Sequence, residues 1–153
     1  MSFSKHTRQL LIQAGWTEDR WFNPRPYELL LQEKGFPVFP VLSQFLARFG
    51  GLSFRNLAAV PPAAEDWHFR VEDALLHAFP NNIAAYSKIV GSPLTPIGEA
   101  FRGYLLLMMD ERVRVFGGFD QVFLVIGTSG EDAIEALCNG RKLQPVLPEQ
   151  PAI

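Results

Sequence analysis

The most informative run of hydrophobic and polar positions covers residues 41–54. Its first part places five apolar residues at helical spacing, so that they share one face of a helix; they are Val41, Leu42, Phe45, Leu46 and Phe49. Gly50 and Gly51 suit the left-handed cap that ends a helix, because glycine has no Cβ to clash at positive φ. Leu52-Ser53-Phe54 then alternates as a strand does. The pattern predicts a buried helix that turns sharply into a strand.

Further helices are expected on both sides of this run. Ser4 can cap a first helix, which carries Leu10, Leu11 and Ala14 on one side. A second helix spans 27–34 after two prolines, with Tyr27, Leu30 and Leu31 as its inner face. Residues 72–79 are expected to be helical, and Asn81 or Asn82 can cap a helix that stops at Gly91.

Strand patterns fill most of the C-terminal half. Residues 104–109 form an unbroken apolar run, which indicates a strand covered on both faces in the middle of a sheet. A turn at Asp110-Glu111 returns it as the strand 113–116. The remaining expected strands are 52–54, 67–69, 97–99 and 122–126. Thr128 and Glu131 have the spacing of a capping box before a last helix, which ends at Asn139-Gly140. The chain is therefore predicted to be an α+β protein, with helices packed on a mainly antiparallel sheet of about four to six strands.

Length and composition favour one globular unit. The 153 residues, 48% of them hydrophobic, suffice for one domain over 1–153, with a core at about 4–142 and a tail at 143–153. No apolar run approaches the roughly 20 residues that cross a bilayer, so no membrane partner is expected. The start lacks the pattern of a secretory signal, and the single Cys138 agrees with a reducing compartment, so we expect a cytoplasmic protein.

The charge is small but unevenly distributed. A net charge of −2 lacks the basic surplus of nucleic-acid-binding proteins. Residues 1–60 carry a net +3 and residues 61–153 a net −5. The acidic half is either a solvated surface or a surface that attracts a basic partner.

Few residues are candidates for chemistry. His6, His68 and His77 are scattered without ligand spacing, so neither a metal nor another cofactor is expected, and Cys138 lies on an apolar helix face as a buried thiol does. Glu99 and Asp110 flank the central strand and, with His68, are candidates for acid–base catalysis in a small hydrolase. The alternative is that Glu99 is buried and paired with Arg20, because a lone buried carboxylate is costly.

The ordered set of motifs resembles the SUKH superfamily of bacterial immunity proteins, in particular its third subgroup. The matching segments, in the family's order over roughly residues 8–140, are Leu11-Ile12-Gln13-Ala14-Gly15-Trp16 followed by Arg20, then residues 35–40, Phe45-Leu46 with 49–54, Pro96-Ile97-Gly98-Glu99, and the helix that ends at Asn139-Gly140. Asp110-Glu111-Arg112 departs from the pattern, since a glycine is expected in that hairpin turn.

The resemblance implies a SUKH-like fold and a binding protein without catalysis. Its partner would be a polymorphic toxin encoded nearby, of the nuclease or deaminase class, and the chain would act as a monomer or weak dimer without contacting nucleic acid. A regulatory scaffold, as in the superfamily's eukaryotic branch, and the small hydrolase are the alternatives. Family-motif positions that serve the fold or binding are Trp16, Arg20, Gly50, Gly51 and Glu99. The partner surface is expected to include the loop 56–66 and Asp66, Asp110, Glu111, Phe119 and Asp120.

Overall fold

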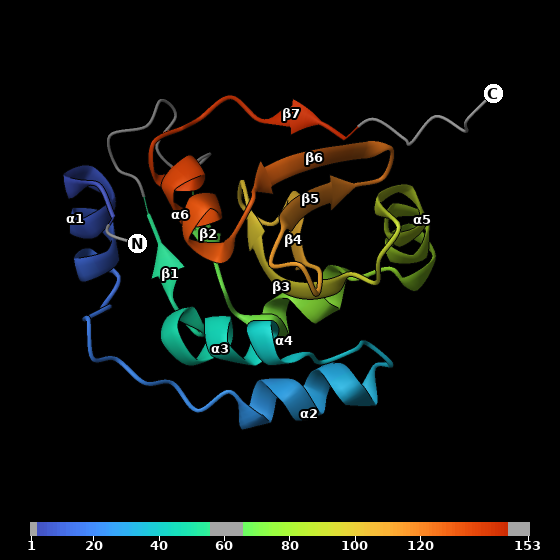
Figure 1. Ribbon diagram of the computed structural model, residues 1–153, viewed down its shortest axis with the longest axis horizontal. Coiled ribbons are helices and arrows are strands. Elements are labelled where there is room, and N and C mark those ends of the chain that lie inside the picture. Colours follow the sequence, from blue (N-terminus) through green and yellow to red (C-terminus); the bar gives the residue numbers. More distant parts are fainter. Residues whose placement is uncertain (1–2, 56–65, 147–153) are drawn as a thin grey trace.

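The computed structural model describes residues 3–55 and 66–146, which form an α+β fold around an antiparallel sheet (Figure 1). Within these ranges the sheet has seven strands in sequential order. The strands are β1 Ser53–Phe54, β2 Trp67–His68, β3 Thr95–Ala100, β4 Leu105–Met109, β5 Val115–Phe119, β6 Val122–Gly127 and β7 Gln144–Pro145. The predicted fold class is confirmed. The sheet has one strand more than expected, because residues assigned to a tail pair with β6 at its edge.

Helices cover the two faces of the sheet unequally. The helical elements are α1 Lys5–Gln13, α2 Arg25–Glu33, α3 Pro40–Phe49, α4 Val71–Ala74, the 3-10 helix η2 Leu75–His77, α5 Pro80–Val90 and α6 Gly130–Cys138. Side chains of α1, α2, α3 and α6 share the main core with one face. The other face packs against α5, at the right of Figure 1. No helix in the described ranges is long and apolar enough to cross a membrane.

The organising helix is confirmed as α3. Leu42, Leu46 and Phe49 are fully buried in the main core, and Gly51 takes a φ of 81° just before β1. The predicted sharp turn from buried helix to strand is therefore present.

The expected central position of residues 104–109 is also confirmed, because β4 is the fourth of seven strands. Leu107 and Met109 point into the main core, whereas Leu106 and Met108 point toward α5. Apolar layers on both faces explain the unbroken apolar run.

Four helix boundaries differ from prediction. Helix α2 covers Arg25–Glu33 instead of 27–34. Residues 72–79 form no single helix, since α4 passes into the 3-10 helix η2. Helix α5 begins at Pro80, which is favoured at the first helical position, so Asn81 and Asn82 lie inside the first turn and neither caps the helix. The last helix is capped by Ser129, which accepts from the N–H of Asp132 at 3.0 Å, so the cap lies one residue later than predicted.

The β4–β5 turn manages without a glycine. Val113 takes the left-handed conformation instead, with a φ of 63°. The buried carboxylate of Asp110 accepts hydrogen bonds from the N–H groups of Arg112 and Arg114, both at 3.0 Å, and pairs with the Arg114 guanidinium. Asp110 thereby organises the turn.

Candidate functional site

A bulge in β3 sets the direction of Glu99. Pro96 lies opposite Met108 and Gly98 lies opposite Leu107, so Ile97 is an extra residue in this strand. One extra residue reverses which face the following side chains point to. Glu99 therefore lies opposite Leu106, on the α5 side of the sheet instead of in the main core.

A row of directly opposed residues crosses this face from β1 to β6. Its members are Ser53, His68, Glu99, Leu106, Gly118 and Phe123. Tyr86 of α5 covers one end, where its ring stacks on Phe123 with centroids 4.6 Å apart and fills the space that a Cβ on Gly118 would need. The rest of the row is the floor of a groove, which we call the open-face groove.

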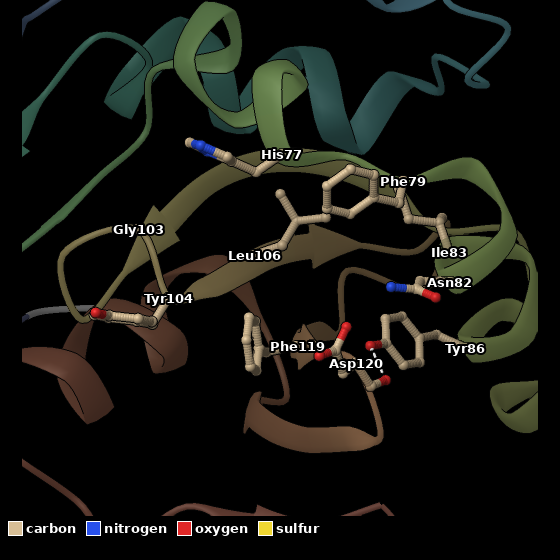
Figure 2. Close-up of a pocket in the computed structure, with 11 residues that line it drawn as sticks. His77, Phe79, Asn82, Ile83, Tyr86, Gly103, Tyr104, Leu106, Phe119 and Asp120 are labelled. Carbon is tan, nitrogen blue, oxygen red and sulfur yellow. Dashed lines mark hydrogen bonds between the residues drawn. The ribbon is translucent and has the colours of Figure 1, made fainter.

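The groove has two lobes that share His77 and Gly103. Figure 2 shows the apolar lobe, with Leu106 at its centre, Phe79 and Ile83 on one side and Phe119 on the other. Three aromatic side chains at its border are largely exposed: Tyr104 at 68%, Phe79 at 61% and Phe119 at 51%. The rings of Tyr104 and Phe119 meet edge to face at 6.4 Å. Exposed aromatic side chains around an apolar hollow are typical of a protein-binding surface.

The second lobe is polar and holds Glu99. One carboxylate oxygen lies 3.1 Å from Nε2 of His68 and the other 2.7 Å from Nδ1 of His77. Nδ1 of His68 accepts the backbone N–H of Arg70 at 3.0 Å, so Nε2 of His68 is the atom that donates to Glu99. Glu99 is thus a buried carboxylate that ties η2 to the sheet through His77.

The apolar lobe also has an acidic border. The hydroxyl of Tyr86 donates to the backbone carbonyl of Asp120, as the dashed line in Figure 2 shows. Burial and then the charge of Asp120 raise the pKa of Tyr86 above its ordinary value. Asp120 itself is exposed and lines the apolar lobe, so an acidic side chain stands at its border.

Backbone strain is concentrated in the turns that border the groove. Among the described residues, four that are not glycine have a positive φ, and three of them lie here: Phe101 at 53°, Arg102 at 60° and Asp120 at 49°. Phe101 and Arg102 precede Tyr104, and Asp120 follows Phe119. Left-handed conformations cost roughly 1 kcal/mol or more per residue outside glycine, and such strain often accompanies functional surfaces.

The arrangement does not support the proposed acid–base pair. Leu106 lies opposite Glu99, and Asp110 follows Leu106 by four residues. The two carboxylate residues are therefore separated by about 13 Å along the strand. Asp110 is fully buried and its oxygens bind Ser92, Arg112 and Arg114. Over residues 3–55 and 66–146, no cluster of three His, Cys, Asp or Glu side chains could hold a metal. Burial raises the pKa of the Cys138 thiol to about 12, which disfavours a nucleophilic thiolate.

Four of the family-motif residues meet at the end of α3 and hold the fold. Trp16 is 2% exposed and stacks on Phe49. The Arg20 guanidinium donates to the carbonyls of Arg48 at 2.8 Å and Gly50 at 2.7 Å. Gly50 and Gly51 pack against the ring of Phe22, where a Cβ would clash.

The expected pairing of Arg20 with Glu99 is wrong. The guanidinium instead binds the free carbonyls at the C-terminus of α3, a site that favours cations. His68 and His77 are the hydrogen-bond partners of the Glu99 carboxylate. The prediction that Glu99 is buried is therefore confirmed, whereas its predicted partner is wrong.

The residues expected to form a partner surface divide into two groups. Asp66 lines the polar lobe, and Phe119 and Asp120 line the apolar lobe. Glu111 is exposed in the β4–β5 turn at the other end of the sheet, and Asp110 is buried there. The expected loop contribution from residues 56–65 lies outside the described residues.

Sequence reasoning missed most residues of the groove, among them His77, Phe79 and Tyr104. Tyr104 was assigned to a buried strand, but β4 begins one residue later and leaves the ring exposed. Two signals in the sequence could have found Tyr104 and Phe79: Gly103 directly before Tyr104, and Pro80 directly after Phe79.

Comparison with known proteins agrees with this picture of a binding protein. A family model described as SUKH-3 immunity protein matches residues 3–140. No curated protein and no solved structure shows significant similarity to the chain.

Proposed function

The chain belongs to the SUKH-3 immunity protein family, and on this premise we propose that it neutralises one cognate toxin by binding it through the open-face groove. Proteins of an immunity family act by binding and not by catalysis. The toxin we propose is a nuclease or deaminase encoded next to this chain, and binding takes place in the cytoplasm.

The observation that carries the choice of surface is the clustering of exposed apolar side chains. Eight large apolar residues of the described ranges are exposed, and five border the groove or lie opposite a residue that does; they are Leu76, Phe79, Tyr104, Phe119 and Val122. The other three lie among the N-terminal helices and their connection. Contiguous apolar surface with aromatic members marks protein interfaces, whereas isolated exposed residues need no explanation.

The acidic residues at the groove support a toxin with a basic surface, although they are few. The acidic surplus of residues 61–153 does not form one patch, because Asp110 is buried and Asp132 and Glu135 on α6 bind Arg141 and Ser4. Asp66, Asp73 and Asp120 line the groove and are at least partly exposed. Toxic nucleases hold phosphates with basic surfaces, and acidic residues at an inhibitor's interface accelerate association with such a surface.

The test begins with the neighbouring reading frame. Its product should kill cells when expressed alone, and co-expression of this chain should restore survival. Binding should be measured by calorimetry with a catalytically inactive toxin domain, and sedimentation should show a 1:1 complex.

Substitutions then locate the surface. Phe119→Ser and Tyr104→Ser should each weaken binding by about tenfold or more, because interface aromatic residues often dominate affinity. Trp21→Ser is the matched control, since Trp21 is 70% exposed but lies outside the groove. Equal affinity of all three variants would reject the groove, and survival unchanged by the wild-type chain would reject the immunity function.

A further inference from the structure

The groove also indicates what kind of toxin segment it receives. We propose that the apolar lobe accepts one aliphatic side chain of the toxin, and that a Lys or Arg adjacent to it pairs with Asp120. This inference rests on the proposed function and specifies the partner's chemistry at the same site.

The shape of the lobe supports a single inserted side chain. Its volume is about 100 Å³, a scale that suits one side chain and not a helix. Ile83, Leu106 and the ring of Tyr86 are buried side chains at its base, and the Phe79 and Phe119 rings stand at its border. An apolar side chain placed there would be removed from water on most sides, which is how anchor residues contribute affinity.

The charges around the groove single out Asp120. The other two acidic residues with exposure there already have cations: Asp66 lies 3.9 Å from Arg55, and Asp73 lies 2.8 Å from Arg70. Asp120 is exposed and makes no ion pair with any residue in 3–55 or 66–146. Arg102 also makes none, but it lines the polar lobe and not the apolar one. Among the described residues, the charge beside the apolar lobe that has no ion-pair partner is therefore the negative charge of Asp120.

A hydrogen bond from α5 fixes the Asp120 turn to the apolar lobe. Asp120 occupies a left-handed turn with a φ of 49°, and its carbonyl accepts the Tyr86 hydroxyl from α5. The turn is thereby attached to the wall of the lobe. A preorganised site loses less entropy on binding than a loop that must order.

The electrostatic half is tested with a matched pair of charge reversals. Asp120→Lys should weaken binding of the inactive toxin domain at least about tenfold, and Asp120→Asn several-fold, mainly through faster dissociation. Glu111→Lys changes the net charge equally but lies at the other end of the sheet, so it should alter affinity less than about twofold. If both reversals weaken binding alike and high salt removes the effect, only diffuse attraction operates and the inference is overturned.

The apolar half is tested by filling the lobe. Asn82 is half-buried on the wall, whereas its neighbour Asn81 is exposed and does not line the lobe. Asn82→Trp should weaken binding at least about tenfold, and Asn81→Trp less than about twofold. Thermal unfolding and near-ultraviolet circular dichroism verify that each variant is folded.

The outcomes separate this inference from the proposed function. Wild-type binding that no variant of Asp120 or Asn82 affects would overturn the inference and leave the immunity function intact. Absence of wild-type binding would overturn both. A free chain that sediments as a dimer and becomes a monomer in Phe119→Ser would show that a second copy occupies the groove, which also overturns the inference.

Discussion

Removal of the Glu99 carboxylate should destabilise the fold without affecting any catalytic turnover. The carboxylate is 4% exposed and has hydrogen-bond partners on two elements, His68 of β2 and His77 of η2. Glu99→Ala deletes both contacts and leaves the Nε2–H of His68, whose side chain is 18% exposed, without its acceptor.

The magnitude follows from the burial of each partner. A hydrogen bond to a charged group contributes about 1.5–3 kcal/mol. The His68 side chain is 18% exposed, so solvent screens its contact only slightly and the lower part of this range applies. The His77 side chain is 57% exposed, so its contact is screened and contributes less than about 1 kcal/mol. We expect Glu99→Ala to lower the free energy of unfolding by about 2–3 kcal/mol and the midpoint of thermal unfolding by about 5–10 °C.

Glu99→Gln should have a smaller effect of about 1 kcal/mol. Its amide oxygen can accept from Nε2 of His68, and its NH₂ group can donate to Nδ1 of His77 once that imidazole carries its proton on Nε2. Both contacts persist, but neither is charge-assisted.

Urea denaturation of the wild type, Glu99→Ala, Glu99→Gln, His77→Ala and Glu99→Ala/His77→Ala measures these values, and the double-mutant cycle built from the two alanine variants isolates the His77 contact. Glu111→Ala is the control. Glu111 is exposed in the β4–β5 turn, so its removal should change the free energy of unfolding by less than about 0.5 kcal/mol. A Glu99→Ala protein within about 0.5 kcal/mol of wild type would refute the reasoning.

Three further substitutions test other parts of the fold. Gly50→Ala should lower the free energy of unfolding, measured in urea, by about 2 kcal/mol or more, because its Cβ would lie 2.5 Å from the Leu46 carbonyl oxygen and 2.9 Å from the Phe22 ring. A decrease below about 0.5 kcal/mol would contradict this packing. Val113→Gly should instead stabilise the protein by about 0.5–1 kcal/mol, because it relieves a branched residue at a φ of 63°, and a loss of stability would show that the Val113 side chain matters more than the strain. Burial alone would raise the pKa of Glu135, but hydrogen bonds from Ser4, Thr7 and Asn139 hold that pKa below the ordinary value of a glutamate. The stabilisation from its charge is therefore present above that ordinary value, about 4.3, and is lost as the pH falls through the lower folded value. Thermal unfolding of Glu135→Gln should therefore show a deficit at pH 7 that shrinks below about pH 4, and a deficit independent of pH would refute the role of the charge.

The sequence predicted those elements whose cause is local. Helix α3 follows from five apolar residues at helical spacing, and the turn after it follows from the need for a positive φ, which Gly51 supplies. The central position of β4 follows from its apolar run, because a strand needs apolar side chains on both sides only when both faces are covered. The SUKH-3 family was likewise recognisable, because its motifs are mostly residues such as Trp16 and Gly50 that hold this fold.

The groove depended on the tertiary structure. The sequence from Pro96 to Glu99 does not predict that Ile97 is an extra residue, although a glycine inside a strand is one sign of a bulge. The bulge turns Glu99 toward His68 and His77. Asp66 and Asp120 are separated by more than fifty residues and come to one groove because β1 to β6 pair in sequence order, which places alternate turns at the same end of the sheet. Register and the packing of α5 are non-local, so periodicity along the chain predicts the strands but not which of their side chains meet.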